Sequence, residues 1–72
     1  MLTFEITRDG DVLEIHADQE GLSVLMSRFE QLRSHGGHLH LMTPAWGGEE
    51  LSEDQQGDEN RLLHHVKVML WG

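Results

Sequence analysis

The sequence has no cysteine, and it has only five basic residues against thirteen acidic ones. Without cysteine no disulfide can stabilise the fold, and the composition fits a reducing compartment. No apolar run approaches the roughly 18 residues of a membrane helix, and no secretory hydrophobic region follows Met1. We therefore expect a soluble cytoplasmic protein. The 72 residues suffice for one domain, 1–72, whose small core supplies only a few kcal/mol of net stability.

The scarcity of positive charge limits the partners that this chain can bind. The formal net charge is −8, and the five basic residues are scattered. Binding to nucleic acid requires Lys and Arg side chains that neutralise phosphates. The composition therefore argues against direct binding to DNA or RNA, and no segment suggests a membrane partner. A basic protein surface is the favoured partner, since complementary potentials raise the rate of encounter.

Motifs of common enzymes are also missing. The chain has no G-x-S-x-G sequence, no phosphate-cradling glycine loop and no cysteine nucleophile. A domain with so small a core has little room for a deep substrate pocket. We expect no catalytic residues, no enzymatic activity and no cofactor.

Alternating apolar and polar residues over 2–7 predict a half-buried strand. Asp9-Gly10 follows and predicts a two-residue hairpin turn in which both residues adopt positive φ. The chain then returns as a second strand over 11–16. This register places Ile6 opposite Leu13 on the inner face.

The same register places Glu5 opposite Glu14 on the outer face of the hairpin. Like charges that face each other directly destabilise a sheet. The sequence leaves two outcomes open. Either Lys67, a protonated histidine or a ligand offsets the two carboxylates, or both side chains splay into water, where exposed charges interact weakly.

A helix is predicted to start at the capping residue Asp18 and to run to about Ser34. Gly36-Gly37 is expected to end it, because glycine readily adopts the left-handed conformation that follows a last helical turn. Apolar residues at helical spacing form the predicted buried stripe: Leu22, Leu25, Phe29 and Leu32.

Two further strands are predicted over 38–42 and 62–71, with apolar residues on both faces of the second. Such a pattern is typical of a central strand, or of one covered on both sides. The order of elements predicts an α+β fold, a small β-β-α-β-β sandwich in which one helix packs on a four-stranded, mainly antiparallel sheet. The long connection over 43–61 is a functional candidate, because loops of this length in compact domains usually carry function or are disordered.

The long connection contains six carboxylates over residues 49–59 and no Lys or Arg. Stability does not require such a concentration of like charge, and loops are common sites of function. Alternatively, the segment is a solvated loop that maintains solubility. As a binding surface, its carboxylates would meet basic side chains, with Trp46 and Leu51 as apolar anchors. The candidate partner-binding residues are Trp46, Glu49, Glu50, Leu51, Glu53, Asp54, Asp58 and Glu59.

Histidines suggest an alternative site. His38 and His40 lie two apart on a predicted strand, so their side chains share one face, about 7 Å apart along the backbone. His65 and His16 are candidates for further ligands, and zinc usually requires three or four converging groups. The alternative interpretation is a polar sheet face whose histidines contact water or a partner. The sequence alone does not show whether the imidazole groups converge on one point.

The C-terminal half carries a pattern of fixed positions. It contains H-L-H-L-M-T-P over 38–44, W-G-G over 46–48, E-L-S over 50–52, Q-G over 56–57, H-V over 65–66 and a tryptophan at 71. This pattern resembles the Immunity protein 32 family of bacterial polymorphic toxin systems. The resemblance implies a cytoplasmic protein that binds and neutralises a cognate toxin domain by blocking it. Many such toxins are nucleases with basic active sites, which an acidic loop would suit.

The leading hypothesis is thus an immunity protein that binds a cognate toxin domain, a nuclease, through its own acidic surface and thereby occludes it. Two alternatives remain. One is a histidine-based metal-binding module, with zinc as its ion. The other is a small homo-oligomeric interaction domain, a homodimer formed through the apolar strand face that carries Met69 and Trp71.

Overall fold

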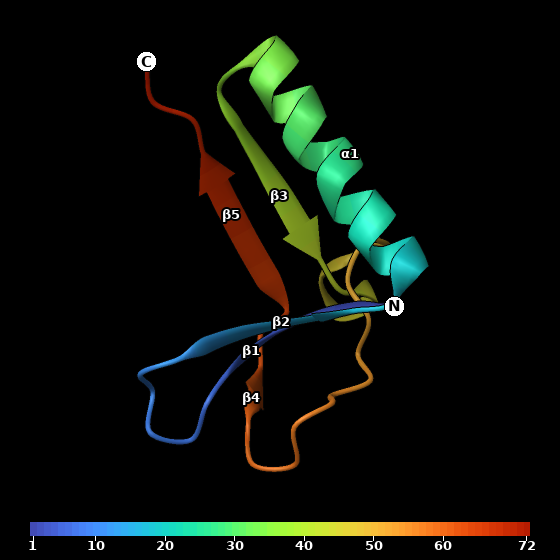
Figure 1. The fold of residues 1–72 in the computed structure, drawn as a ribbon, viewed down its shortest axis with the longest axis vertical. Helices are drawn as coiled ribbons and strands as arrows, with labels where there is room; N and C mark the ends of the chain where they lie inside the picture. The colour runs from blue at the N-terminus through green and yellow to red at the C-terminus, as the bar shows by residue number, and fades with distance from the viewer.

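The computed structural model describes residues 1–72 and contains one α-helix, a short 3-10 helix and five strands. The elements are β1 (Leu2–Ile6), β2 (Leu13–Ala17), α1 (Gln19–His35), β3 (His38–Met42), η1 (Pro44–Trp46), β4 (Arg61–Leu62) and β5 (His65–Met69). They form one sheet of order β2-β1-β4 and a second of order β3-β5. In Figure 1, α1 lies beside β3, while β1 and β2 run across the direction of β3 and β5. The predicted α+β class is confirmed, with two small antiparallel sheets in place of one four-stranded sheet.

The register of the first hairpin is the predicted one. β1 and β2 pair antiparallel, with Ile6 opposite Leu13 and Glu5 opposite Glu14. This agreement follows from the alternation of apolar residues, because a slip of one position would turn every apolar side chain of a strand to the other face.

The hairpin turn differs from the prediction. Only Gly10 adopts a positive φ, of 79°, and Asp9 does not. The Asp9 carboxylate instead accepts hydrogen bonds from Thr7 Oγ1 at 2.6 Å and from the backbone N–H of Asp11 at 3.0 Å. Side-chain capping of this kind is a usual role of Asp in turns. The N–H of Gly10 donates to the carbonyl of Thr7 at 2.8 Å, so the backbone turn spans 7–10 and Asp9 is a central residue that needs no positive φ.

The helix begins and ends as predicted. Asp18 accepts a hydrogen bond from the N–H of Gly21 at 2.8 Å, and Gly36, with φ of 74°, closes the last turn. The predicted stripe is only half buried: Leu25 and Leu32 are in the core, but Leu22 and Phe29 are 45% and 44% exposed. The two sheets under the helix are narrow, so they cover only part of the apolar face.

The predicted strand over 62–71 is one extended segment that changes partner. Its first part, β4, pairs with β1, and the N–H of Leu63 still donates to the carbonyl of Phe4. The carbonyl of His64 then accepts from the N–H of Thr43, and β5 continues along β3. The expectation of a central strand is therefore wrong: β5 pairs only with β3, and the segment joins the two sheets at a corner.

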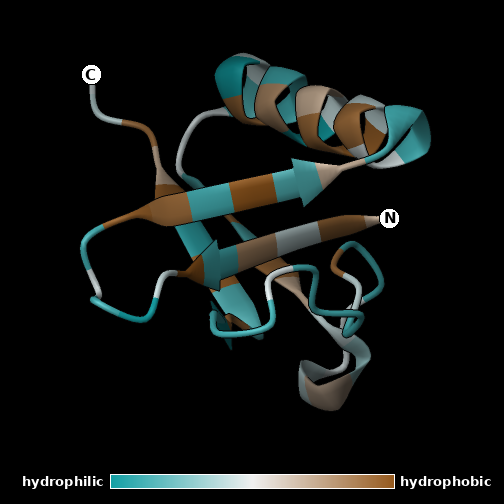
Figure 2. Ribbon diagram, turned by 60° about the horizontal axis from the view of Figure 1, so that its bottom comes forward, coloured by the Kyte–Doolittle hydropathy of each residue, from teal (hydrophilic) through white to brown (hydrophobic).

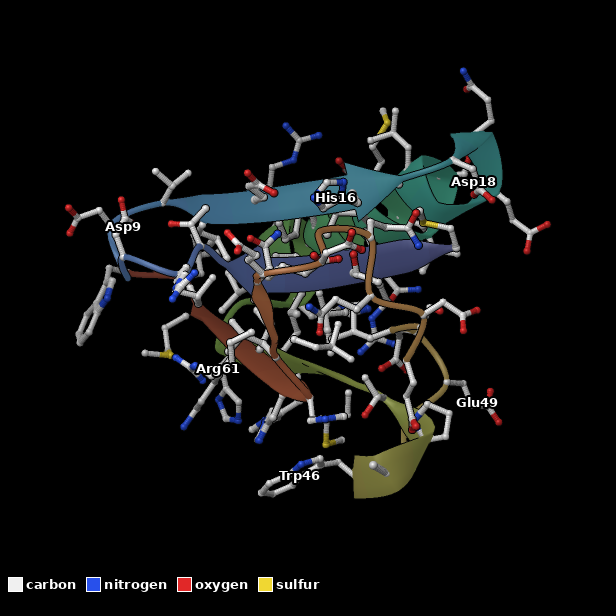
Figure 3. The ribbon with its side chains drawn as sticks, turned by 90° about the horizontal axis from the view of Figure 1, so that it is seen from below. Asp9, His16, Asp18, Trp46, Glu49 and Arg61 are labelled. Atoms are coloured by element: carbon white, nitrogen blue, oxygen red, sulfur yellow. The ribbon has the colours of Figure 1, made fainter.

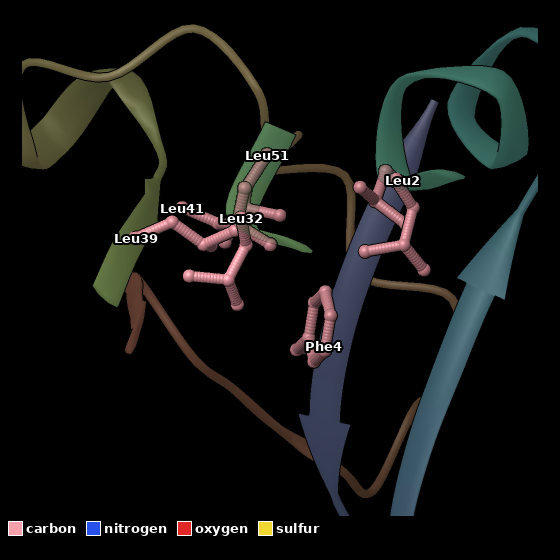
Figure 4. Packing of buried hydrophobic residues seen from close by; sticks show 7 residues of the cluster. Leu2, Phe4, Leu32, Leu39, Leu41 and Leu51 are labelled. Atoms are coloured by element: carbon pink, nitrogen blue, oxygen red, sulfur yellow. The ribbon is translucent and has the colours of Figure 1, made fainter. Parts of the chain in front are cut away.

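The core lies between the helix and the inner faces of both sheets. Figure 4 shows its side chains converging from separate elements, and in Figure 2 the segments that connect the strands are largely hydrophilic. No helix is both long and apolar enough to cross a membrane. The seven buried apolar residues are Leu2, Phe4, Leu25, Leu32, Leu39, Leu41 and Leu51.

Candidate functional site

A buried carboxylate fixes the acidic segment, residues 49–59, to the body of the protein. Glu5 lies on the outer face of β1 and is fully buried. Its Oε2 accepts from Thr3 Oγ1 at 2.6 Å and from the N–H of Gln56 at 2.9 Å. Its Oε1 accepts from the N–H of Gly57 at 3.0 Å and from Asn60 Nδ2 at 2.9 Å. Of the two outcomes left open by the sequence, the one in which Glu5 splays into water is wrong, because the acidic segment folds over this face of β1.

The repulsion between Glu5 and Glu14 is offset by a histidine and an amide. Glu14 Oε1 accepts from His16 Nε2 and from Asn60 Nδ2, each at 2.9 Å. His16 Nε2 also lies 3.9 Å from Glu5 Oε1. Lys67, another candidate for this role, is on the second sheet opposite His40. A histidine was thus one of the predicted solutions, whereas the part played by Asn60 was missed.

These contacts determine the ionisation of the pair. Burial by itself would raise the pKa of Glu5, but hydrogen bonds from Thr3, Asn60, Gln56 and Gly57 together lower it from 4.5 to about 2. Hydrogen bonds from His16 and Asn60 lower the pKa of Glu14 as well. Glu5 is therefore a buried anion at neutral pH, and its ionised form is part of the fold.

We expect acid to destabilise the protein through Glu5. In the unfolded chain this carboxyl takes up its proton near pH 4.5, whereas the folded protein holds it ionised down to about pH 2. Unfolding binds a proton in this range, so the stabilisation is complete above about pH 5 and is lost as the pH falls towards 2. The loss amounts to about 3 kcal/mol. Urea unfolding across this range measures the loss, and carbon NMR of the Glu5 carboxyl isolates its titration from those of other carboxyls. A Glu5 signal that titrates near pH 4.5 would contradict the prediction.

The first half of the acidic segment is also held by the body. Leu51 is 2% exposed and belongs to the core, so the structure removes it from the predicted partner-binding surface. Its N–H donates to the carbonyl of Met42 at 3.2 Å, and the N–H of Ser52 donates to the carbonyl of Leu2 at 2.8 Å. Glu50 Oε1 accepts from the N–H of Met42 at 3.1 Å. Glu50 thereby covers an open edge of β3, which would otherwise present unpaired groups.

The remaining carboxylates of the segment differ in their surroundings. Glu59 forms an exposed ion pair with Arg8, 3.1 Å between Oε1 and Nη1. Glu53 is exposed but accepts a hydrogen bond from the N–H of Ala45 at the start of η1. The other three are exposed and form no ion pair with the molecule's own cations: Glu49, Asp54 and Asp58. The segment is fixed in place, yet most of its negative charge faces outward.

Trp46 stands at the edge of this acidic segment. It ends η1, is 60% exposed, and its ring lies 5.4 Å from that of His65. Figure 3 shows Trp46 and Glu49 on the side of the molecule away from His16. Met69 and Trp71, which suggested a dimer, are 52% and 87% exposed. A homodimer stays a prediction.

Three of the four histidines considered for a metal site lie together. His38 and His40 on β3 and His65 on β5 share one face of the second sheet, and His40 Nδ1 is 2.7 Å from His65 Nε2. Burial, followed by the neighbouring His65, His38 and Lys67, lowers the pKa of His40. His16 is on the first sheet, beside Glu14, and does not join them.

Comparison with known proteins identifies the family. The family model described as Immunity protein 32 matches residues 12–66, a span that includes the acidic segment and all three clustered histidines. No curated protein and no solved structure matched the chain. The family description is that of an immunity protein, which points to an immunity function and, in general, to a toxin as the partner. The match covers most of the sequence, and the chain belongs to the Immunity protein 32 family.

Proposed function

We propose that this protein neutralises a cognate toxin domain in the cytoplasm by covering a basic surface of that domain with its acidic segment. The observation that carries the proposal is that the backbone of the acidic segment is held in place while several of its carboxylates stay exposed and form no ion pair. Glu5, Leu51 and Ser52 hold the segment to the body. Glu49, Asp54 and Asp58 nevertheless remain exposed and unpaired. Such preorganisation lowers the entropy lost on binding.

The neighbouring Trp46 supports the same surface. Protein interfaces draw most of their binding energy from a few residues, among which Trp is enriched, while surrounding charges set the rate and the register of association. Trp46 is 60% exposed and rests against His65, so its ring is accessible and already positioned. An aromatic anchor beside a negatively charged rim fits a partner whose basic groups surround an apolar pocket.

A nuclease is the class of toxin that best fits this charge. Nuclease active sites must hold phosphates, so they are basic, and the exposed carboxylates of residues 49–59 would occupy the positions of substrate phosphates. Inhibition would be steric and electrostatic, and this chain would need no catalytic residue. The toxin domain encoded beside this protein should therefore cleave DNA or RNA and stop doing so when the protein is added. A partner that acts on another substrate would overturn the nuclease assignment.

We expect the association rate with that toxin domain to fall strongly with salt. Raising the ionic strength from about 20 mM to about 500 mM shortens the Debye length from roughly 20 Å to a few ångström, which removes long-range attraction. The association rate constant should drop about 10- to 100-fold, while the dissociation rate constant changes much less. Stopped-flow fluorescence of the tryptophans measures both. Absence of a complex at low salt would sink the proposed function.

A further inference from the structure

The outward face of the second sheet gathers nitrogen and sulfur donors. His38 and His40 alternate along β3 on this face, and His65 begins β5. In the register of the two strands, Met42 is opposite His65 and Met69 is opposite His38. We call these three histidines and two methionines the histidine face. No carboxylate belongs to either strand, so the face differs in chemistry from the acidic segment.

Two imidazoles of the histidine face already converge. His40 Nδ1 and His65 Nε2 are 2.7 Å apart, and their ring centroids are 4.9 Å apart. The ring of His38 lies 5.1 Å from that of His40, at an interplanar angle of 86°. Two zinc-bound imidazole nitrogens, each about 2.05 Å from a tetrahedral ion, are about 3.3 Å apart. To admit an ion, the pair would have to give up its hydrogen bond and open by only about 0.6 Å, and His65 is exposed.

We propose that the histidine face binds one late first-row divalent transition-metal ion, of which zinc is the natural case. His40 and His65 are the two primary ligands, and His38 is the third. Imidazole suits zinc, copper and nickel, whereas magnesium and calcium prefer oxygen. The thioethers of Met42 and Met69 flank the histidines and reinforce this preference for softer ions. Water would complete the coordination, as it does at zinc sites with three protein ligands.

A second cluster of potential ligands and a neighbouring lysine bear on the choice of the metal site. Glu5, Glu14 and His16 form the tightest group, with one ligand atom of each within 4.8 Å of the others. Both oxygens of Glu5, however, accept two hydrogen bonds each, so its lone pairs already face donors and not a cation. On the histidine face the opposing group is Lys67, directly across from His40. Its positive charge should weaken metal binding, and removing it should strengthen it.

The test uses the isolated protein and is independent of any toxin. Native mass spectrometry with Zn²⁺ should show one ion per chain, and the double variant His40→Ala, His65→Ala should bind at least about 100-fold more weakly, since two of three protein ligands are gone. His35→Ala is the matched control, because His35 is exposed at the end of α1 and should leave the affinity unchanged. Lys67→Gln should bind several-fold more tightly. No bound ion, or an equal affinity in the double variant, would overturn the site.

A second readout reports the position of the ion. In a Trp71→Phe variant, Trp46 is the one remaining tryptophan, and its ring lies 5.4 Å from that of His65. Cu²⁺, which quenches nearby indoles, should quench this fluorescence at one equivalent, and EDTA should restore it. The urea midpoint of each variant tests whether folding is retained, which we expect because His65 is exposed and His40 is only half-buried. Quenching that persists in the His40→Ala, His65→Ala variant would place the copper elsewhere and overturn the assignment.

Discussion

Glu5→Gln is expected to destabilise this protein by about 3 kcal/mol and to release its acidic segment. Each oxygen of Glu5 accepts two hydrogen bonds. Oε1 accepts both from N–H groups, and Oε2 accepts one from an N–H group and one from the hydroxyl of Thr3. Glutamine keeps a single oxygen, so in either orientation its NH₂ group would face at least one backbone N–H that can only donate. Leaving buried donors without an acceptor costs about 1–3 kcal/mol, and more where the lost acceptor is charged. A domain of this size has a net stability of roughly 3–5 kcal/mol, so much of it would be lost.

Urea unfolding and hydrogen exchange together measure this effect. The amides of Gln56 and Gly57 should lose protection in Glu5→Gln, because both donate to this carboxylate. Glu14→Gln is the matched control: its side chain is 39% exposed and accepts through one oxygen, so we expect a much smaller loss of stability. Unchanged protection of Gln56 and Gly57 in Glu5→Gln would mean that the segment is held by other contacts.

The burial of Glu5 shows where prediction from sequence stopped. The alternation of apolar residues correctly placed Glu5 opposite Glu14 on the outer face of the hairpin. What covers that face is a segment without regular secondary structure, and such a segment has no periodicity from which its path can be read. The unexplained pair of facing carboxylates was the available signal. It indicated a compensating group as one of two outcomes, and it did not identify Asn60 or the backbone of Gln56.

The pairing of strands was the other feature that the sequence did not predict. The parity of β3 and β5 correctly placed His38, His40 and His65 outward, because side-chain direction follows from local alternation. His16 has the same local pattern but belongs to the first sheet. Its separation from the others depends on which strands pair. The switch of partner between β4 and β5 depends on the same long-range choice, so alternation over 62–71 predicted one strand and missed the corner.

Reversing the three exposed, unpaired carboxylates of the acidic segment to lysine should lower the association rate with the toxin domain about 100-fold at low salt. Each reversal changes the charge by two, so the triple variant moves the formal net charge from −8 to −2. Electrostatic steering accounts for 10- to 1,000-fold of fast association rates, and it depends on charge close to the contact surface. Because the segment is held by Glu5 and Leu51, folding should be little affected. The variant carries Glu49→Lys, Asp54→Lys and Asp58→Lys.

A second triple variant separates local charge from net charge. It has the same formal net charge of −2 but reverses exposed carboxylates of the hairpin loop and of α1, which lie outside the acidic segment. If the toxin contacts residues 49–59, this control should slow association much less than the first variant at about 150 mM salt, where a Debye length of about 8 Å limits steering to charges close to the contact. Equal rates for the two triple variants would show that only the overall charge matters. The toxin would then be expected to bind the exposed surface formed by Trp46 and the histidine face. In that case zinc and the toxin would compete for the histidine face. The control carries Asp11→Lys, Glu20→Lys and Glu30→Lys.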